Sequence, residues 1–191
     1  TWVRSLISSY YFTKDGNFDF SLLSNIDQYP QQKFFDRKIN KPGEISNFWE
    51  DSQKKIIEKK EIKLFKTHNS LTALNGKKFT SEKYTLGAIY IVRDPRNVVT
   101  SWANHDSISF EESANNLIDK SFKVGGLNNS KKDIVSYTGS WNFNYNSWKN
   151  LKDQKRYLLI KYEDLITKKK TVLLRVFKFL NSLGMKFQID M

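Results

Sequence analysis

The segment AIYIVRDPRNVVTSWANH, residues 88–105, decides the fold of this chain. Its strand portion, GAIYIV over residues 87–92, is apolar throughout, a pattern typical of a parallel strand that is buried on both faces. Asp94 can cap a following helix, and Pro95 suits the first helical position. A strand that passes directly into a helix is the basic unit of an α/β fold.

Two polar residues of this segment are candidates for ligand binding. Arg93 ends the strand, and ligands of open parallel sheets bind at the carboxyl ends of strands. Ser101 lies two helical turns after Asp94 and so shares its face of the helix. A guanidinium and a hydroxyl that converge can hold a phosphate. In the alternative interpretation, Arg93 pairs with a nearby carboxylate and Ser101 bonds within its own helix.

The remaining hydrophobic pattern alternates between helical and strand periods. It predicts a single domain over 1–191 of the α/β class with a largely parallel sheet. Before the opening segment we predict a helix over 1–12, irregular chain over 13–46, a helix over 47–60 and a strand over 62–67. After the strand and helix of that segment, we predict a helix from Ser109 to about 119 and a helix with Trp141, Tyr145 and Trp148 on one face. A strand over 156–162 and a final helix ending near Gly184 complete the predicted elements.

A second group of candidates follows the strand that ends in LFKTH, residues 64–68. His68 can serve as a general base because the unperturbed imidazole pKa of ~6.5 leaves much of it neutral at physiological pH. Lys66, on the same strand face, can neutralise anionic charge beside it. A structural histidine is the competing interpretation, and it fits His105 better. Tyr162 can stack on a base or fill an edge of the core, and the pattern favours the core.

Composition narrows the class of partner. The chain has 191 residues, a formal charge of +12 and no cysteine, which favours an anionic partner and excludes disulfides and thiolate metal sites. With two histidines, a histidine-rich metal site is not expected. No apolar run approaches the roughly 20 residues of a membrane helix, so no membrane segment is expected. The lysine runs at 54–63 and 168–170 are interpreted as solvated helix faces.

Taken together, four blocks resemble the sulfotransferases that use 3′-phosphoadenosine 5′-phosphosulfate (PAPS). YIVRDPRNVVTSW (90–102) is similar to the 3′-phosphate motif of that family, and LFKTH to the strand that carries its catalytic histidine. LLIKYEDL with the helix that ends in FKFLNSLG (158–184) is similar to its YED-L segment. TWVRSL at the start resembles the end of its phosphosulfate loop.

The resemblance implies a P-loop NTPase-like sandwich with a central, largely parallel sheet flanked by helices. It also implies PAPS as cosubstrate without a metal. Arg93 and Ser101 would then bind the 3′-phosphate, Thr1 would touch the 5′-phosphate side, and Trp2 and Tyr162 would flank the adenine.

The same resemblance assigns the chemistry. His68 would deprotonate an acceptor hydroxyl or amine that attacks sulfur in line, and Lys66 would lie near the transferring group. The acceptor would be a small molecule or a carbohydrate. Its pocket would be formed by the loops over 13–46 and 106–138, which leaves the acceptor's identity and the oligomeric state open.

The family's loop lysine, serine and glycine would precede Thr1, and its R-K-G segment would follow Met191. We therefore expect a fragment that lacks the first strand of the fold and is poorly folded or inactive on its own. A cytoplasmic location is expected from the absence of cysteine and of a visible membrane anchor.

Three alternatives remain open from the sequence. A P-loop kinase would share the fold class but requires a Walker lysine and a magnesium-binding carboxylate, and it leaves the pair Arg93 and Ser101 unexplained. A nucleic-acid-binding module would need its charge gathered on one face with exposed aromatics, whereas the lysines here are dispersed. A non-catalytic sulfotransferase-like binding protein is disfavoured by the intact His68.

Overall fold

The computed structural model describes residues 2–59, 61–125, 134–151 and 155–187. Its helices are α1 (Trp2–Phe12), α2 (Trp49–Ile57), α3 (Pro95–Asp106), α4 (Phe110–Ile118), α5 (Trp141–Lys149), α6 (Tyr162–Thr167) and α7 (Lys169–Ser182), with 3-10 turns η1 (Phe20–Asn25), η2 (Gln32–Phe34) and η3 (Pro42–Phe48). Its strands are β1 (Asp27–Gln28), β2 (Phe65–Lys66), β3 (Ala73–Leu74), β4 (Lys77–Lys78), β5 (Ala88–Val92), β6 (Lys123–Val124), β7 (Ser136–Tyr137) and β8 (Tyr157–Lys161).

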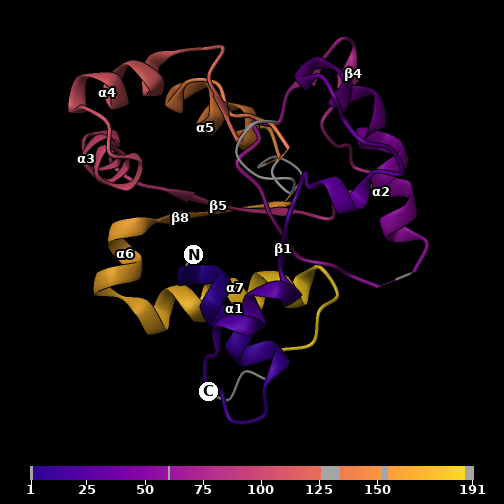
Figure 1. The fold of residues 1–191 in the computed structure, drawn as a ribbon. Coiled ribbons are helices and arrows are strands. Elements are labelled where there is room, and N and C mark those ends of the chain that lie inside the picture. The colour runs from indigo at the N-terminus through magenta and orange to yellow at the C-terminus, as the bar shows by residue number, and fades with distance from the viewer. Residues whose placement is uncertain (1, 60, 126–133, 152–154, 188–191) are drawn as a thin grey trace.

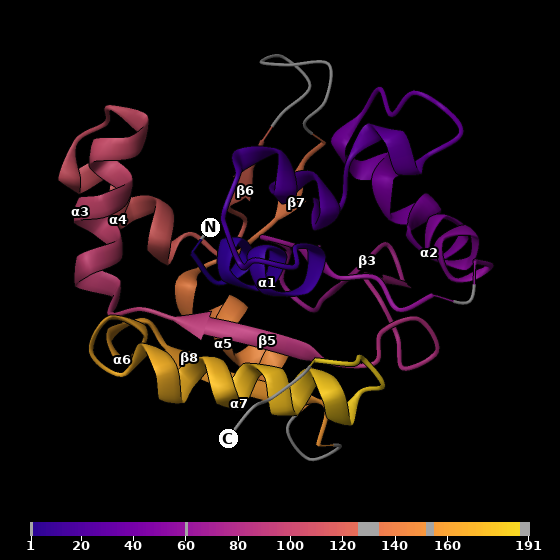
Figure 2. The same ribbon diagram turned by 90° about the horizontal axis from the view of Figure 1, so that it is seen from below.

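The centre of the fold is the parallel pair of β5 and β8. All five residues of each strand pair, from Ala88 opposite Tyr157 to Val92 opposite Lys161. Figures 1 and 2 show α7 along one face of this pair and α5 on the other, with α3 and α4 beyond the carboxyl ends of the strands. β1 and β2 form a second parallel pair, and the pairs β3–β4 and β6–β7 are antiparallel. The α/β class with parallel strands is confirmed, and these strands form two separate pairs.

Two hydrophobic clusters hold the layers together. The first joins α1, β8 and α7, and the rings of Tyr10 and Phe177 stack there with centroids 4.5 Å apart. Its fully buried members include Ile160, Leu165, Val172 and Val176. The second surrounds Trp49, which is wholly buried against Phe79. Each cluster removes large apolar side chains from water, the main favourable term in folding.

The helix starts follow the capping chemistry expected from the sequence. Asp94 accepts a hydrogen bond from the Arg96 backbone N–H at 2.9 Å, and Ser109 accepts one from Glu112 at 3.0 Å. Each side chain satisfies an N–H group that lacks a partner within its helix.

Burial of β5 on both faces was a wrong expectation. The strand is half-buried, and Ile91 is 42% exposed. Among the described residues β5 pairs with β8 alone, so its other edge is not covered by a strand. The predicted strand over 62–67 is also shorter, since only Phe65 and Lys66 pair with another strand.

The space around Gly87, the residue before β5, shows how closely this part of the chain packs. A Cβ at Gly87 would lie 2.8 Å from a methyl carbon of Leu183 and 3.0 Å from the Arg156 carbonyl oxygen. Because the carbonyl belongs to the backbone, Gly87→Ala should lower the free energy of unfolding by about 1–3 kcal/mol, measured by urea denaturation. Gly43→Ala is the matched control, because nothing lies within 4 Å of the added carbon. Equal effects of the two substitutions would contradict this packing.

Candidate functional site

The register of β5 and β8 places Arg93 beside Tyr162. Val92 pairs with Lys161, so the next residue of each strand emerges at the same edge of the sheet. The guanidinium carbon of Arg93 lies 4.7 Å from the centroid of the Tyr162 ring, a cation–π contact. The ring itself packs against the first core cluster. Tyr162 thus lies at the edge of the core, as the sequence pattern favoured, and also supports Arg93.

The neighbouring carboxylate is occupied by a different arginine. Asp94 accepts hydrogen bonds from the Arg96 side chain, including one from Nε at 3.0 Å. The Arg96 side chain and backbone N–H together lower the pKa of Asp94 to about 2. In the described part of the chain, the Arg93 guanidinium has no ion pair and the exposed Ser101 hydroxyl has no hydrogen bond. Neither internal pairing of the alternative interpretation is therefore present among these residues.

A second link joins the ends of the two strands. The backbone N–H of Asp94 donates to the Glu163 carboxylate at 3.4 Å. Because Asp94 caps α3 and Glu163 lies in α6, this contact connects the starts of the helices that follow β5 and β8. Together with the cation–π contact, it fixes the edge from which Arg93 projects.

The other candidates lie where β2 meets α1. Lys66 is half-buried, and its pKa is lowered by burial and then by the positive charge of Arg4. Arg4 projects from α1 and donates a hydrogen bond to the Leu23 carbonyl oxygen. Its Nε is buried without a partner. The structure therefore brings two cations together here. The sequence reasoning missed Arg4, whose signal was that it is the one charged residue of its helix.

His68 follows the same strand and is exposed to solvent. Desolvation by the surrounding protein lowers its pKa to about 4, and the positive charge of Lys66 acts in the same direction. The imidazole is therefore neutral at physiological pH and has a free lone pair for a proton. This is the state that a general base requires.

The remaining predicted residues are at the start of the chain. Trp2 is 48% exposed, and the ammonium group of Lys169 lies 4.7 Å from its ring centroid. Trp2 therefore offers an accessible aromatic surface. Thr1 lies outside the described residues.

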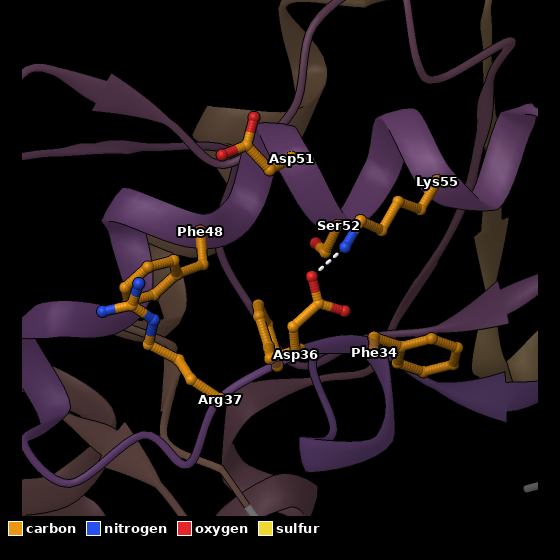
Figure 3. A pocket seen from close by; sticks show the side chains of 8 residues that line it. Phe34, Asp36, Arg37, Phe48, Asp51, Ser52 and Lys55 are labelled. Atoms are coloured by element: carbon orange, nitrogen blue, oxygen red, sulfur yellow. Dashed lines mark hydrogen bonds and ion pairs between the residues drawn. The ribbon is translucent and has the colours of Figure 1, made fainter.

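A cavity of about 160 Å³ lies elsewhere, between α2 and the chain before it (Figure 3). Three phenylalanine rings line it, together with Asp36, Arg37, Asp51, Ser52 and Lys55. Figure 3 shows the ion pair between Lys55 and Asp36, which both line the cavity. Phe34 also contacts Phe65, whereas Lys66 points to the opposite face of β2, because successive strand residues alternate. The cavity is thus separate from the predicted site.

Comparison with protein-family models shows the family of this chain. The profile of the sulfotransferase domain matches residues 1–184. The chain belongs to the sulfotransferase domain family.

One solved structure to which the chain is similar is that of the mouse sulfotransferase SULT7A1 complexed with PAP. It is 20% identical in sequence, with a TM-score of 0.44, and the match covers 68% of this chain and 44% of that one. The chain therefore spans less than half the length of that relative. A search of the curated proteins finds no match.

Two further observations concern the described ranges alone. They contain no group of three or more histidine, cysteine, aspartate or glutamate side chains placed to hold a metal ion. Within them, no helix has the length and apolar character needed to span a bilayer.

The low pKa of His68 predicts a loss of stability in acid. In the unfolded chain His68 takes up a proton near pH 6.5, whereas in the folded chain it does so near pH 4. Between these values the unfolded state binds more protons, so stability falls as the pH is lowered. Denaturant unfolding at about pH 7 and about pH 5 should show this loss in the parent protein and less of it in His68→Gln. His105→Gln should behave as the parent, and an equal acid loss in all three proteins would refute the assignment.

Proposed function

We propose that this chain is a domain of a PAPS-dependent sulfotransferase that moves the sulfuryl group to a hydroxyl or amine acceptor. The observation that carries the proposal is the state of Arg93 at the edge of β5 and β8, together with that of Ser101 in α3, the helix that follows β5. Arg93 is held on the Tyr162 ring, the neighbouring Asp94 is occupied by Arg96, and the Ser101 hydroxyl is exposed. Such an arrangement suits a dianionic group that approaches from solvent.

The group proposed to bind here is the 3′-phosphate of PAPS. The forked guanidinium of Arg93 can donate two hydrogen bonds to phosphate oxygens, and the Ser101 hydroxyl can donate a third. Hydrogen bonds to charged groups contribute roughly 1.5–3 kcal/mol each. That is enough to prefer PAPS over a nucleotide without the 3′-phosphate.

The adenine is proposed to lie against Trp2 and Tyr162. The accessible ring of Trp2 supports this assignment, because base–aromatic stacking needs an exposed π-face. Thr1, beside Trp2 in the chain, is assigned to the 5′-phosphate side by family resemblance.

The chemical step is assigned to His68 and Lys66. His68 takes the proton of the acceptor, whose oxygen or nitrogen forms a bond to sulfur. The bond between sulfur and the 5′-phosphate oxygen breaks, and its electrons remain on the departing phosphate. The positive charges of Lys66 and the nearby Arg4 stabilise that developing negative charge, the type of electrostatic catalysis that also governs phosphoryl transfer.

The acceptor is proposed to be a small molecule or a carbohydrate bound near the segments 13–46 and 106–138, of which residues 126–133 lie outside the described residues. Exposed aromatic side chains support this, since they suit apolar and sugar rings alike. Phe20 is 78% exposed, and Phe18 contacts it edge-on.

The 3′-phosphate assignment is tested by nucleotide binding. Isothermal titration should show tighter binding of 3′,5′-adenosine bisphosphate than of 5′-AMP. Arg93→Met or Ser101→Ala should weaken bisphosphate binding roughly 10- to 150-fold, because each removes charge-assisted hydrogen bonds, and should leave AMP binding nearly unchanged.

Two variants serve as matched controls for this titration. Arg37→Met also removes an arginine that lies over an aromatic ring, that of Phe48 at 4.9 Å. Thr100→Ala removes the hydroxyl next to Ser101 in α3. Neither should alter binding. Equal affinity of the parent protein for the two nucleotides would overturn the 3′-phosphate assignment.

The role of His68 is tested by sulfate transfer from PAPS, measured with the full-length protein. His68→Ala should lower kcat about 10²- to 10⁴-fold, the usual contribution of a general base, without weakening bisphosphate binding. His105→Ala is the control and should retain full activity, since its imidazole is exposed and, among the described residues, pairs with the neighbouring Asp106. Parent-like turnover by His68→Ala would remove His68 from the mechanism.

A further inference from the structure

Asn144, in the middle of α5, makes hydrogen bonds to three separate segments. Its Nδ2 donates to the carbonyl oxygen of His68 at 3.2 Å and to that of Thr138 at 3.0 Å. Its Oδ1 accepts a hydrogen bond from the Tyr90 hydroxyl at 3.0 Å. Both amide hydrogens and the amide oxygen are thus engaged, and one of the bonded groups belongs to His68 itself.

The Tyr90 hydroxyl fixes the orientation of this amide. Burial, and then Tyr157, raise the pKa of Tyr90, so the hydroxyl keeps its proton and remains a donor. A flipped Asn144 amide would direct Oδ1 at two carbonyl oxygens and its NH₂ group at a donor. The observed orientation is therefore the only one of the two that satisfies every group.

The segment after His68 is fixed by other contacts. Asn69 is 1% exposed, its side chain accepts from the Tyr137 N–H at 2.8 Å, and its carbonyl accepts from the Trp148 indole at 2.9 Å. Before His68, the carbonyl of Lys66 accepts from Tyr29 at 2.8 Å. His68 therefore lies between two fixed points. Among the described residues, the side chain of Asn144 donates a hydrogen bond to the carbonyl oxygen of His68.

Asn144 also connects the two halves of the candidate site. Tyr90 belongs to β5 and lies three residues before Arg93, whereas His68 follows β2. β5 and β2 belong to different sheets. The path from Tyr90 through Asn144 to His68 therefore links the strand proposed to bind the nucleotide to the proposed base (α5 and β5 are labelled in Figure 1).

We propose that Asn144 is a positioning residue for sulfuryl transfer: it holds the backbone of His68 at a set place relative to β5, so that the imidazole faces the acceptor. The inference rests on the proposed role of His68. Misplacement of a catalytic group by about 1 Å can cost about 10²-fold in rate. Asn144→Ala should therefore lower kcat about 10- to 100-fold, with KM for PAPS and bisphosphate affinity within about twofold of the parent.

The kinetic test is a double-substitution cycle. The product of the full reading frame is assayed as parent, Asn144→Ala, His68→Ala and the combination of both. If Asn144 acts through His68, the combination should be no slower than His68→Ala alone. Asn146→Ala is the matched control, because its amide bonds only to Asn142 within the same exposed face of α5, and it should keep parent kcat.

Two milder variants separate positioning from stability. Tyr90→Phe keeps the Asn144 side chain but removes the hydroxyl that orients it, and it should lower kcat by less than about 10-fold. Asn144→Asp keeps the shape and can still accept from Tyr90, but it loses both donors and should lower kcat about 10- to 100-fold. These two variants test the inference even if Asn144→Ala fails to fold.

A spectroscopic test does not depend on activity. The chain contains two histidines, so ¹⁵N-histidine labelling follows His68 with His105 as internal reference. Asn144→Ala should shift the imidazole signals and the titration midpoint of His68 and leave those of His105 in place.

The experiments distinguish a failure of the inference about Asn144 from a failure of the proposed function. Parent kcat in Asn144→Ala with a slow His68→Ala, losses that multiply in the combination, or an unchanged His68 spectrum would each overturn the role of Asn144. A parent protein without sulfate transfer, or one in which His68→Ala is fully active, would instead overturn the proposed function. In that case the spectrum still decides whether Asn144 positions His68.

Discussion

The parallel pairing of β5 with β8 is the constraint on which the rest of the structure depends. Its register places Val92 opposite Lys161, so the chain leaves both strands at the same edge. Arg93 and Tyr162 become neighbours there although they lie far apart in the sequence. The pair also gives α5 and α7 opposite faces to cover, and through Tyr90 it reaches the residues around His68. One set of backbone hydrogen bonds thus positions both groups of candidate residues.

A second feature of the structure is which cation pairs with each carboxylate near the candidate site. Asp94 follows Arg93 directly, yet its ion pair is with Arg96. Burial lowers the pKa of Arg4 and the nearby Asp27 partly offsets this effect, yet the ion pair of Asp27 is with Lys33. In both places an exposed cation, Arg96 or Lys33, forms the ion pair with the carboxylate. Exposed ion pairs of this kind contribute little to stability, but here they leave positive charge available on the two candidate arginines.

Unneutralised positive charge costs stability when no ligand is bound. Burial and Arg4 lower the pKa of Lys66, and desolvation by the surrounding protein and then Lys66 lower that of His68. An anionic ligand would relieve this repulsion, so binding and folding favour the same arrangement. A cluster of cations around a neutral histidine is therefore an arrangement suited to an anionic donor and a proton-bearing acceptor.

Several features of the fold could be predicted from the sequence because they depend on local patterns. The caps at Asp94 and Ser109, the apolar stripe of α7 and the class of fold all follow from residue types at fixed spacing. The β1–β2 pairing and the two short antiparallel pairs could not be predicted, because their two-residue strands carry no periodicity. The half-exposed state of β5 depends on which strands neighbour it, and an apolar run does not contain that information.

The residues of the candidate site also divide into those that local sequence patterns reveal and those that only tertiary contacts reveal. Arg93, Ser101 and His68 stand out because each follows or faces the end of an apolar strand. Arg4 and Asn144 act through tertiary contacts with Leu23, Tyr90 and His68, which no local pattern specifies. Asparagine in a helix is unremarkable until the three segments around it are known.

The central claim is that the edge of β5 and β8 binds the 3′-phosphate of the sulfuryl donor. A crystal structure of the protein with 3′,5′-adenosine bisphosphate tests it most directly. The account predicts the 3′-phosphate within hydrogen-bonding distance of the Arg93 guanidinium and the Ser101 hydroxyl, with Arg93 still on the Tyr162 ring. A 3′-phosphate bound elsewhere, or exposed to solvent with Arg93 and Ser101 unengaged, would contradict it.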